Sequence, residues 1–387
     1  MSFPIWPDYD KDEIAAVEEV LRSGKVNYWG GDQGDSFEKE FAAYTGVRHA
    51  VALANGTVAL EAALHALGIG DGDEVIVPAR TFIATASSVV MCGAVPVVAD
   101  IDLHSGNLTI ETIEAARTEK TKAVIVVHLG GWPCDMPEIM RYAETHGLKV
   151  IEDCAQSHGA EIDGQKVGSF GHASAFSFCQ DKIISTGGEG GMLTTDDQDV
   201  WKKVWALKDH GRDYDEVFNR HHQPGHRWYS TTFGTNWRLT EMQSAIGRIQ
   251  LKKLPEWLSV RRSHAAQLID GLSDVRGLNI HLPGRGVLHS YYRFYASIDM
   301  ERLHADWNQD RIIDAIKAEG VPCFHGSCSE IYREKAFKQF MRDSYPLPNA
   351  RFVGRSSMAL LLHPNLQSEH MEKTVSVVRQ VFSSAAG

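Results

Sequence analysis

The sequence predicts an α/β fold built on a mostly parallel sheet and followed by a smaller α+β domain. From about residue 48, short β-rich runs alternate with helical patterns, as is typical of a parallel sheet covered by helices on both faces. The alternation ends after Asp209, where a polar, histidine-rich stretch begins. The 387 residues, 43% of them hydrophobic, are enough to bury two cores. We therefore expect a large domain over residues 1–250 and a small C-terminal domain over residues 251–387.

The strands of the large domain are expected in five short apolar runs, at residues 50–53, 75–77, 96–99, 123–127 and 149–151. Helical patterns lie between these runs, for example at residues 58–67 and 137–146. Strands and helices in this order join into crossovers that are expected to be right-handed.

The second half of the chain begins with a polar loop over residues 212–229, which we expect to cover an active site. A long helical pattern follows over residues 239–272. The remaining patterns predict a strand at residues 291–298, a helix at 309–319 and a final helix at 370–382. This mixture is the basis for predicting a separate α+β domain.

The composition argues against several classes of partner. A formal charge of −11 disfavours non-specific attraction to nucleic acid or to anionic membranes. No apolar stretch approaches membrane-spanning length, and the first residues lack the basic start and apolar run of a secretory signal. The six cysteines form no CxxC pair, which favours free thiols in a reducing compartment. We therefore expect a cytoplasmic protein.

The first motif is Ala-Asn-Gly-Thr at residues 54–57, where an apolar run enters a helical pattern. Such a turn aims free backbone N–H groups and the positive end of the helix dipole at one point, which suits a phosphate. Gly56 and Thr57 are the candidate phosphate-binding residues. The alternative interpretation is that Gly56 merely permits a tight turn and Thr57 begins the helix.

The second motif follows the apolar run at residues 149–151 and includes Asp153 and Gln156. It delivers an acid to the carboxyl end of a strand, where open α/β sheets bind ligands. A carboxylate there can keep a pyridine nitrogen protonated, so that the ring acts as an electron sink. Asp153 could instead cap a helix or pair with a neighbouring base.

The third motif runs from an apolar strand at residue 176 to Lys182 and on into a glycine cluster at residues 187–191. A lysine that forms an imine needs a partly desolvated pocket that lowers its pKa, and this context is compatible with one. The alternative interpretation is an ordinary surface lysine.

Taken in order, the motifs resemble those of the DegT/DnrJ/StrS family of pyridoxal 5'-phosphate (PLP)-dependent sugar aminotransferases. The motifs are Gly-Thr at a helix start, Asp-x-x-Gln-x-x-Gly after a strand, Ser-Phe-x-x-x-Lys with Gly-Glu-Gly-Gly, and Asn-Trp-Arg at residues 236–238. The resemblance extends from Trp29 to the C-terminal helix. It implies an aspartate-aminotransferase-like large domain (PLP fold type I) with a mixed, mostly parallel sheet, and a smaller C-terminal α+β domain.

The resemblance also implies roles around the cofactor ring. Lys182 would hold PLP as a Schiff base and then shuttle protons between substrate and cofactor carbons. Asp153 would pair with the pyridinium nitrogen, and Gln156 would lie near the phenolic oxygen. Phe82 would stack on the ring.

At the phosphate end, the resemblance assigns contacts to Gly56, Thr57 and Ser177. Asn236 would reach the same phosphate from a second subunit, which implies a homodimer with shared active sites. Arg238 is expected to meet an anionic part of the substrate, and His325 is a second candidate substrate residue.

The implied reaction has two halves. L-glutamate donates its amino group to the cofactor, which then aminates a keto-sugar for polysaccharide, lipopolysaccharide or antibiotic biosynthesis. The expected acceptor is a nucleotide-linked 3-keto or 4-keto sugar. Residues 321–330 depart from the Tyr-x-Pro-Leu-His form that is more common in the family, which raises an 8-oxo octulosonate-type sugar acid as a second option.

Other functions remain open. A family branch that removes a hydroxyl has histidine where this chain has Lys182, which argues against a dehydratase. A PLP-dependent lyase of the same fold would keep Lys182 and Asp153 but would not need the motif at residues 236–238. A non-catalytic PLP-binding regulator would not need all the chemical groups present. His221, His222 and His226 share one polar loop without evident residues to orient them, so we expect no metal site.

Overall fold

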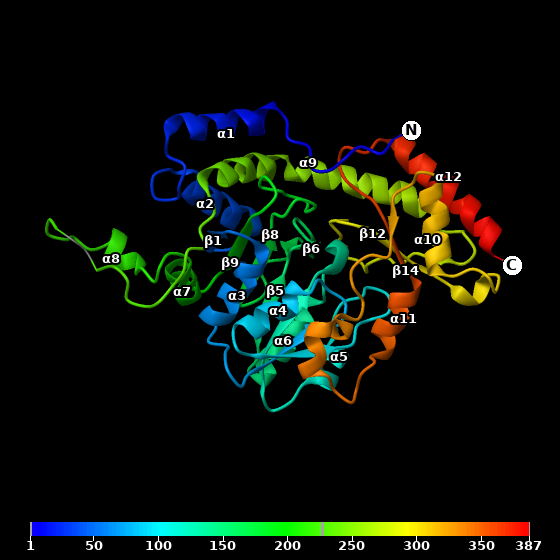
Figure 1. Cartoon of the computed structure of the whole chain (residues 1–387), viewed down its shortest axis with the longest axis horizontal. Coiled ribbons are helices and arrows are strands. Elements are labelled where there is room, and N and C mark those ends of the chain that lie inside the picture. The colour runs from blue at the N-terminus through cyan, green and yellow to red at the C-terminus, as the bar shows by residue number, and fades with distance from the viewer. Residues whose placement is uncertain (1, 226–227, 387) are drawn as a thin grey trace.

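The computed structural model describes residues 2–225 and 228–386. A seven-stranded sheet in the order β1-β9-β8-β5-β4-β2-β3 forms its centre (Figure 1). Its strands are β1 (His49–Leu53), β2 (Glu74–Pro78), β3 (Val95–Ala99), β4 (Thr121–Val127), β5 (Lys149–Asp153), β8 (Ala173–Ser177) and β9 (Gly191–Thr195). β9 runs antiparallel to both of its neighbours, and the other neighbouring pairs are parallel. The predicted mixed, mostly parallel sheet is thus confirmed, and so are the five predicted strands.

Both faces of this sheet are buried, because alternate residues of each strand enter different cores. In β4, Ala123 and Ile125 belong to the core on one face, whereas Val124 and Val126 belong to the core on the other. The covering helices and the short 3-10 turn after β4 are α3 (Gly56–Ala66), α4 (Ala84–Met91), α5 (Ile110–Ala116), η1 (Leu129–Gly131), α6 (Met136–His146) and α7 (Gln198–Lys208).

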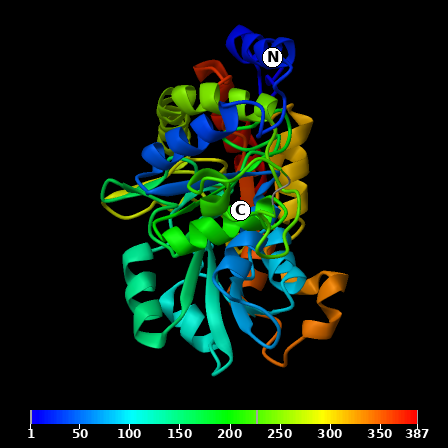
Figure 2. The same cartoon turned by 90° about the vertical axis from the view of Figure 1, so that its left-hand side faces the viewer.

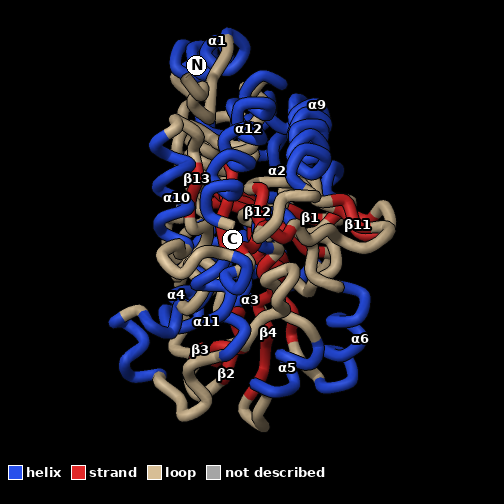
Figure 3. The backbone as a smooth tube through the Cα atoms, turned by 90° about the vertical axis from the view of Figure 1, so that its right-hand side faces the viewer, coloured by secondary structure: helices blue, strands red, loops and turns tan. Residues whose placement is uncertain are grey.

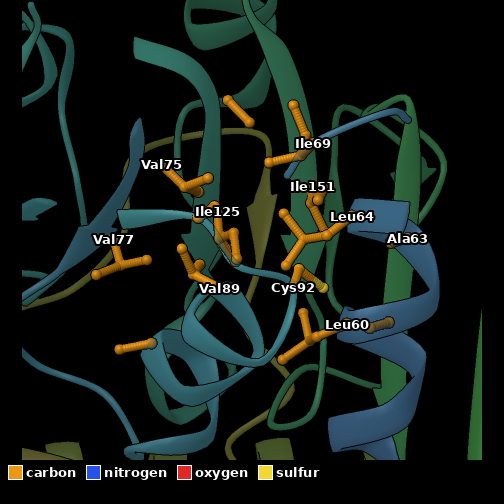
Figure 4. Packing of buried hydrophobic residues seen from close by; sticks show 14 of the residues in the cluster. Leu60, Ala63, Leu64, Ile69, Val75, Val77, Val89, Cys92, Ile125 and Ile151 are labelled. Atoms are coloured by element: carbon orange, nitrogen blue, oxygen red, sulfur yellow. The ribbon is translucent and has the colours of Figure 1, made fainter. Parts of the chain in front are cut away.

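Helix α3 packs closely on the sheet because most of its buried residues are alanine or leucine. Figure 4 shows Leu60 and Leu64 of this helix facing the sheet residues Ile125 and Ile151, and all four are buried in one cluster. Burying a leucine side chain contributes about 1.5–3 kcal/mol. This packing fixes the first turn of α3 beside the carboxyl ends of β5 and β8.

Helix α9 (Glu241–Leu272) joins the two halves of the molecule. Thr240 and Gln243 form a capping box at its start, which explains why a helix begins here. It contacts α1 (Lys11–Ser23) and α2 (Gln33–Thr45), and it also contacts α12 (Ser368–Ala385). Figures 1 and 2 show α1, α2 and α9 gathered at one end of the molecule. The long helix predicted over residues 239–272 is confirmed.

The C-terminal part holds a four-stranded antiparallel sheet in the order β10-β12-β14-β13. Its strands are β10 (Leu278–Asn279), β12 (Phe294–Ile298), β13 (Cys323–Phe324) and β14 (Ser357–Leu360), and its helices are α10 (Gln309–Ala318), α11 (Pro348–Ser356) and α12. Figure 3 shows α10 and α12 beside this sheet. β12 begins three residues later than predicted, because Tyr291 has a φ of 50° and turns the chain before the strand.

The connections hold the remaining short elements. These are β6 (Glu161–Ile162), β7 (Gln165–Lys166), β11 (Val287–Leu288), α8 (Tyr214–Phe218), η2 (Met300–Arg302), η3 (Ile331–Arg333) and η4 (Lys335–Phe340). The polar stretch predicted as a loop contains α8, which projects from the body of the molecule (Figure 1). Residues of η3, η4 and α11 pack into the core of the large sheet, although they lie beyond residue 250. The domain boundary remains a prediction. In the part of the chain that the structure describes, no helix is both long and apolar enough to cross a membrane.

Candidate active site

A cavity of about 840 Å³ lies where α3 and the carboxyl ends of β4, β5 and β8 meet residues from the C-terminal part. Parallel strands present ligand-binding groups at this edge. Seven of the predicted site residues line it, namely Gly56, Thr57, Phe82, Asp153, Gln156, Ser177 and Lys182. Three motifs far apart in the sequence therefore meet in one cavity.

Lys182 follows β8, and its side chain is only 15% exposed. Its backbone carbonyl accepts a hydrogen bond from the indole of Trp6 at 2.7 Å. Nζ lies 3.8 Å from Oδ1 of Asp181 and 4.9 Å from the centroid of the Tyr292 ring. Burial is the largest single effect on Lys182 and would lower its pKa, but the neighbouring acidic groups of Tyr292, Asp181 and Asp153 together outweigh burial and raise the pKa. The pKa of this lysine is therefore raised in this structure and not lowered as predicted, because several acidic groups act together against burial.

Asp153 is the last residue of β5 and is 6% exposed. Its Oδ2 accepts a hydrogen bond from Oγ1 of Thr85 at 2.9 Å, and its Oδ1 accepts one from the backbone N–H of Ala155 at 3.1 Å. The Thr85 hydroxyl also lies 2.8 Å from that of Thr81. Burial raises the pKa of Asp153 even though both hydrogen bonds and nearby Lys182 oppose this effect. A cationic group in the cavity would relieve that cost.

At the other end of the cavity, the Asn55 side chain caps α3 by accepting a hydrogen bond from the N–H of Val58 at 3.0 Å. First-turn N–H groups, such as those of Gly56 and Thr57, have no acceptor within the helix. Gly56 has no left-handed φ, but a Cβ on it would lie 2.7 Å from Cβ of Ser177. The glycine is therefore required for close approach of α3 to β8 rather than for a tight turn. The result is an anion cradle of backbone N–H groups beside a serine hydroxyl.

Between these two ends lie an aromatic ring and an amide. Phe82 is 68% exposed at the cavity, so one of its faces is available to a planar ligand. Gln156 is held in place because its Oε1 accepts a hydrogen bond from the N–H of Gly130 at 2.7 Å. Both residues line the same cavity as Lys182 and Asp153.

A buried polar network lies behind the cavity. His128, Glu152 and Cys154 place potential metal-ligand atoms within 4.8 Å of one another. His128 Nε2 lies 3.1 Å from Oε2 of Glu152, and its Nδ1 accepts a hydrogen bond from the N–H of Cys134. Glu152 also accepts hydrogen bonds from Gly168 N–H, Phe170 N–H, Gly171 N–H and Ser174 Oγ. Because His128 and Glu152 already have these partners, their hydrogen bonds anchor the end of β5, next to Asp153.

The loop histidines lie apart from this network. Nε2 of His222 is 2.6 Å from the carbonyl oxygen of Glu216. His221 belongs to the same loop, and His226 lies outside the described residues.

Three predicted site residues do not line the cavity that the described residues form: Asn236, Arg238 and His325. Arg238 is paired with buried Asp209, whose backbone in turn bridges to Asn236. The His325 side chain is 51% exposed, and its Nε2 lies 2.7 Å from Oδ1 of Asp310. The roles expected for these three residues stay predictions.

The sequence interpretation missed several lining residues. Asp181, Tyr292 and Arg293 form a polar group at the cavity, with Arg293 Nη2 3.5 Å from Oδ2 of Asp181 and the Tyr292 hydroxyl donating to the same oxygen. Asp181 precedes Lys182, which was a usable signal. The sequence around Tyr292 and Arg293 contains no motif that indicates a role at the cavity. These two residues come from the C-terminal part of the chain, far from the three motifs. Thr85 was also missed, although it ends the segment that contains Phe82.

The residues present fit PLP. An amine available for a covalent bond, a buried carboxylate for a pyridinium nitrogen, an exposed aromatic face and an anion cradle line one cavity of sufficient size. Lys182, Asp153, Phe82 and Gly56 with Ser177 supply these four features in turn.

Comparisons with known proteins agree with this geometry. The model of the DegT/DnrJ/EryC1/StrS aminotransferase family matches residues 7–379. A UDP-N-acetyl-3-dehydro-alpha-D-glucosamine 3-aminotransferase of Acidithiobacillus ferrooxidans is 38% identical over 91% of this chain and 89% of its own length. A GDP-perosamine synthase of Caulobacter vibrioides is 38% identical over 89% of each chain.

Among solved structures, an aminotransferase from Psychrobacter cryohalolentis superposes with a TM-score of 0.97 at 48% identity, covering 99% of both chains. The predicted fold type I architecture is thereby confirmed, and it implies PLP as the cofactor. The chain therefore belongs to the DegT/DnrJ/EryC1/StrS aminotransferase family, and it is an enzyme of the aminotransferase class.

Proposed function

We propose that this enzyme uses PLP to transfer an amino group from L-glutamate to a keto-sugar. The observation that carries the proposal is the convergence of Lys182, Asp153 and the cradle at Gly56 in one cavity. Two relatives are named for reactions of nucleotide sugars, which supports a nucleotide-linked 3-keto or 4-keto sugar as the acceptor. An 8-oxo octulosonate-type sugar acid is the second candidate acceptor.

In this proposal the cofactor, when bound, withdraws electrons from the bonds around the carbon that carries the amino group. Asp153 would keep the pyridine nitrogen protonated, and Thr85 holds the carboxylate by a hydrogen bond. Gln156 would contact the phenolic oxygen, and Phe82 would pack on the ring. The N–H groups of Gly56 and Thr57 and the hydroxyl of Ser177 would bind the phosphate.

Lys182 has two tasks, covalent attachment and proton transfer. Its Nζ would remove a proton from the substrate carbon that bears the amino group and would deliver a proton to a carbon of the cofactor on the other side of the shared nitrogen. Asp181 and Tyr292 hold this amine near the cavity wall, so that it stays within reach of both carbons. Arg293 borders the same space and offers a guanidinium to a substrate carboxylate.

We further propose a homodimer in which each subunit completes the site of the other. Asn236 does not reach the cavity of its own chain, as expected for a residue that acts across an interface. Phe233 is fully exposed, and α8 projects from the body of the molecule, which gives the partner a surface to contact (Figure 1). The shared site can be tested by mixing two inactive variants.

The variants are Lys182→Ala and Asn236→Ala. In a mixed dimer, one site combines the intact Lys182 of one chain with the intact Asn236 of the other. Random reassociation should restore about one quarter of wild-type activity, because half of the dimers are mixed and each has one complete site. Analytical ultracentrifugation should show dimers throughout. Failure to restore activity in confirmed mixed dimers would contradict the cross-subunit role of Asn236.

The reaction itself is tested one half at a time. PLP-loaded enzyme mixed with L-glutamate should lose its visible absorbance and release one 2-oxoglutarate per site. The aminated enzyme should then convert one acceptor from a panel of 3-keto and 4-keto nucleotide sugars and an 8-oxo octulosonate, with the amino product identified by mass spectrometry. Loss of absorbance without 2-oxoglutarate would instead indicate a lyase, and no spectral response would indicate a non-catalytic binder.

The proposed setting is cytoplasmic biosynthesis of an amino sugar for a surface polysaccharide or lipopolysaccharide. All six cysteines are free, as is usual for proteins in a reducing compartment. A genetic test is deletion of the gene, which should remove an amino sugar from the surface polysaccharide of the source organism.

A further inference from the structure

A second cavity, of about 400 Å³, lies behind the wall of the Lys182 cavity. We call it the Arg80 cavity. The loop after β3, strand β12 and the junction of α11 with β14 form its walls. Tyr295 lines both cavities, and its hydroxyl accepts a hydrogen bond from the N–H of Ser327 on the Lys182 side at 3.0 Å. The proposed transamination makes no use of this space.

Arg80 is a buried charged residue in the wall of this cavity, and only 5% of its surface is exposed. Nη2 donates a hydrogen bond to Oγ of Ser357 at 2.5 Å, and the guanidinium lies 4.6 Å from the centroid of the Tyr295 ring. Nε has no hydrogen-bond partner, and within residues 2–225 and 228–386 no carboxylate pairs with this arginine. Burial lowers the pKa of Arg80, but an arginine guanidinium stays charged in proteins.

A buried cation without an acidic partner is costly, and the cost is relieved when an anion binds to it. Arg80 lies two residues after the end of β2, and its partner Ser357 is the first residue of β14 in the C-terminal sheet. A hydroxyl and an aromatic face orient the guanidinium but do not neutralise it. The missing component is therefore a negative charge, and the adjoining cavity has room for the molecule that carries it.

The other walls restrict the charge of that molecule. Nδ1 of His104 lies 3.0 Å from Nδ1 of His281, so one ring must donate a proton to the other. Burial, assisted by the charge of His104, lowers the pKa of His281 and favours the neutral form of His281. Asp299 and Glu301 border the cavity, and Oδ2 of Asp299 is paired with Nε of Arg302 at 3.1 Å. A site that joins the Arg80 guanidinium with the acid Glu301 suits a monoanion better than a phosphate dianion.

The remaining surface is largely apolar and includes Leu129, Phe294 and Phe352. We propose that the Arg80 cavity binds a small organic acid, with its one carboxylate on the Arg80 guanidinium and its apolar body against Phe294 and Phe352. Because Tyr295 separates the two cavities, this acid lies directly behind the wall of the active site. The inference goes beyond the proposed transamination and does not depend on it.

The test measures binding of benzoate to the PLP-loaded full-length enzyme by isothermal titration calorimetry. Benzoate should bind with one site per chain, and the neutral isostere benzamide and inorganic phosphate should bind at least tenfold more weakly. Arg80→Gln should weaken benzoate binding at least tenfold, because it removes a charge-assisted contact. Two matched controls, Arg351→Gln on exposed α11 and Arg293→Gln in the Lys182 cavity, should leave the affinity unchanged.

A second variant guards against misfolding of the Arg80 substitution. Phe352 is 57% exposed, so Phe352→Ala should fold normally while it weakens benzoate binding more than acetate binding. The proposal is overturned if wild-type enzyme shows no heat with benzoate or binds benzamide equally well. It is also overturned if Arg293→Gln rather than Arg80→Gln removes binding, since the ligand would then occupy the active site.

Discussion

Oδ1 of Asp181 lies 3.8 Å from Nζ of Lys182, the next residue in the chain, and Oδ2 of the same carboxylate accepts a hydrogen bond from the hydroxyl of Tyr292. The amine proposed to carry the cofactor thus has an acid beside it in its resting state. This carboxylate raises the pKa of Lys182 together with Tyr292 and Asp153, against the effect of burial. The ammonium form is therefore favoured until a ligand changes the surroundings.

Asp181→Asn should shift the pH dependence of cofactor uptake to lower pH. Covalent attachment needs the neutral amine, and removing the carboxylate lowers the pKa of Lys182, so the neutral fraction rises at any given pH. The rate at which apoprotein takes up PLP should be followed by absorbance across a pH series. Asp306→Asn, at an exposed acid in the C-terminal part of the chain, serves as the control. A profile that stays unchanged in Asp181→Asn would show that this carboxylate does not influence the amine.

Lys182→Ala should lower kcat by about 10³-fold or more, because it removes both the attachment point and the proton carrier. The fold should survive, since the Trp6 indole bonds to the backbone of residue 182 and not to its side chain. Turnover of glutamate and circular dichroism check the two parts of this prediction. Lys122→Ala, at an exposed position of β4, should behave as wild type. More than trace activity in Lys182→Ala would refute the assignment.

Asp153→Asn should lower kcat by about 10²-fold or more while PLP still binds, because an amide cannot hold the pyridine nitrogen in its protonated form. Asparagine has the same shape, and its Oδ1 can still accept the hydrogen bond from the N–H of Ala155, while its Nδ2 can donate one to the Thr85 hydroxyl. Half-reaction rates with glutamate provide the measurement. Thr85→Val should cause a smaller loss, since it only loosens the carboxylate. Equal rates for Asp153→Asn and wild type would exclude this role.

Gly56→Ala should weaken PLP binding and destabilise the protein by about 1–3 kcal/mol, as expected for overpacking. Its Cβ would lie 2.7 Å from that of Ser177, so α3 would have to move away from β8. Equilibrium dialysis of PLP and urea unfolding of the apoprotein measure the two effects separately. Gly284→Ala is the matched control, because a Cβ there meets nothing within 4 Å. Wild-type PLP affinity in Gly56→Ala would argue against a phosphate cradle at this turn.

Lys208→Met should lower the free energy of unfolding by about 3–5 kcal/mol, because it leaves a nearly buried acid unpaired. Lys208 is fully buried, and its Nζ lies 2.6 Å from Oε1 of Glu38, whose side chain is 10% exposed. Adding Glu38→Gln to this variant should recover part of the loss. Urea unfolding measures both.

The control for this pair is the exposed ion pair of Arg22 with Glu18, where both side chains are more than half exposed. Arg22→Met should change the free energy of unfolding by about 1 kcal/mol or less. Similar losses at the two ion pairs would contradict the importance assigned to burial.

The sequence alone determined the strands and most of the long helices, because each is encoded by a local pattern. The five predicted strands are short β-rich runs. Helix α9 begins where Thr240 and Gln243 form a capping box. The three motifs also identified Gly56, Asp153 and Lys182 as lining residues, since each follows a strand at the edge where ligands bind.

The tertiary structure decided which distant residues meet. Tyr292 and Arg293 join Asp181 only because the C-terminal part packs over the edge of the large sheet. Arg238 forms an ion pair with buried Asp209. Strand β12 begins later than predicted because Tyr291 has a left-handed backbone conformation. Among the described residues Arg80 has no acidic partner for the same reason, since the groups that contact it come from segments more than 200 residues away in the sequence. Local patterns specify backbone conformation, whereas the balance of charges in a cavity depends on how whole elements pack together.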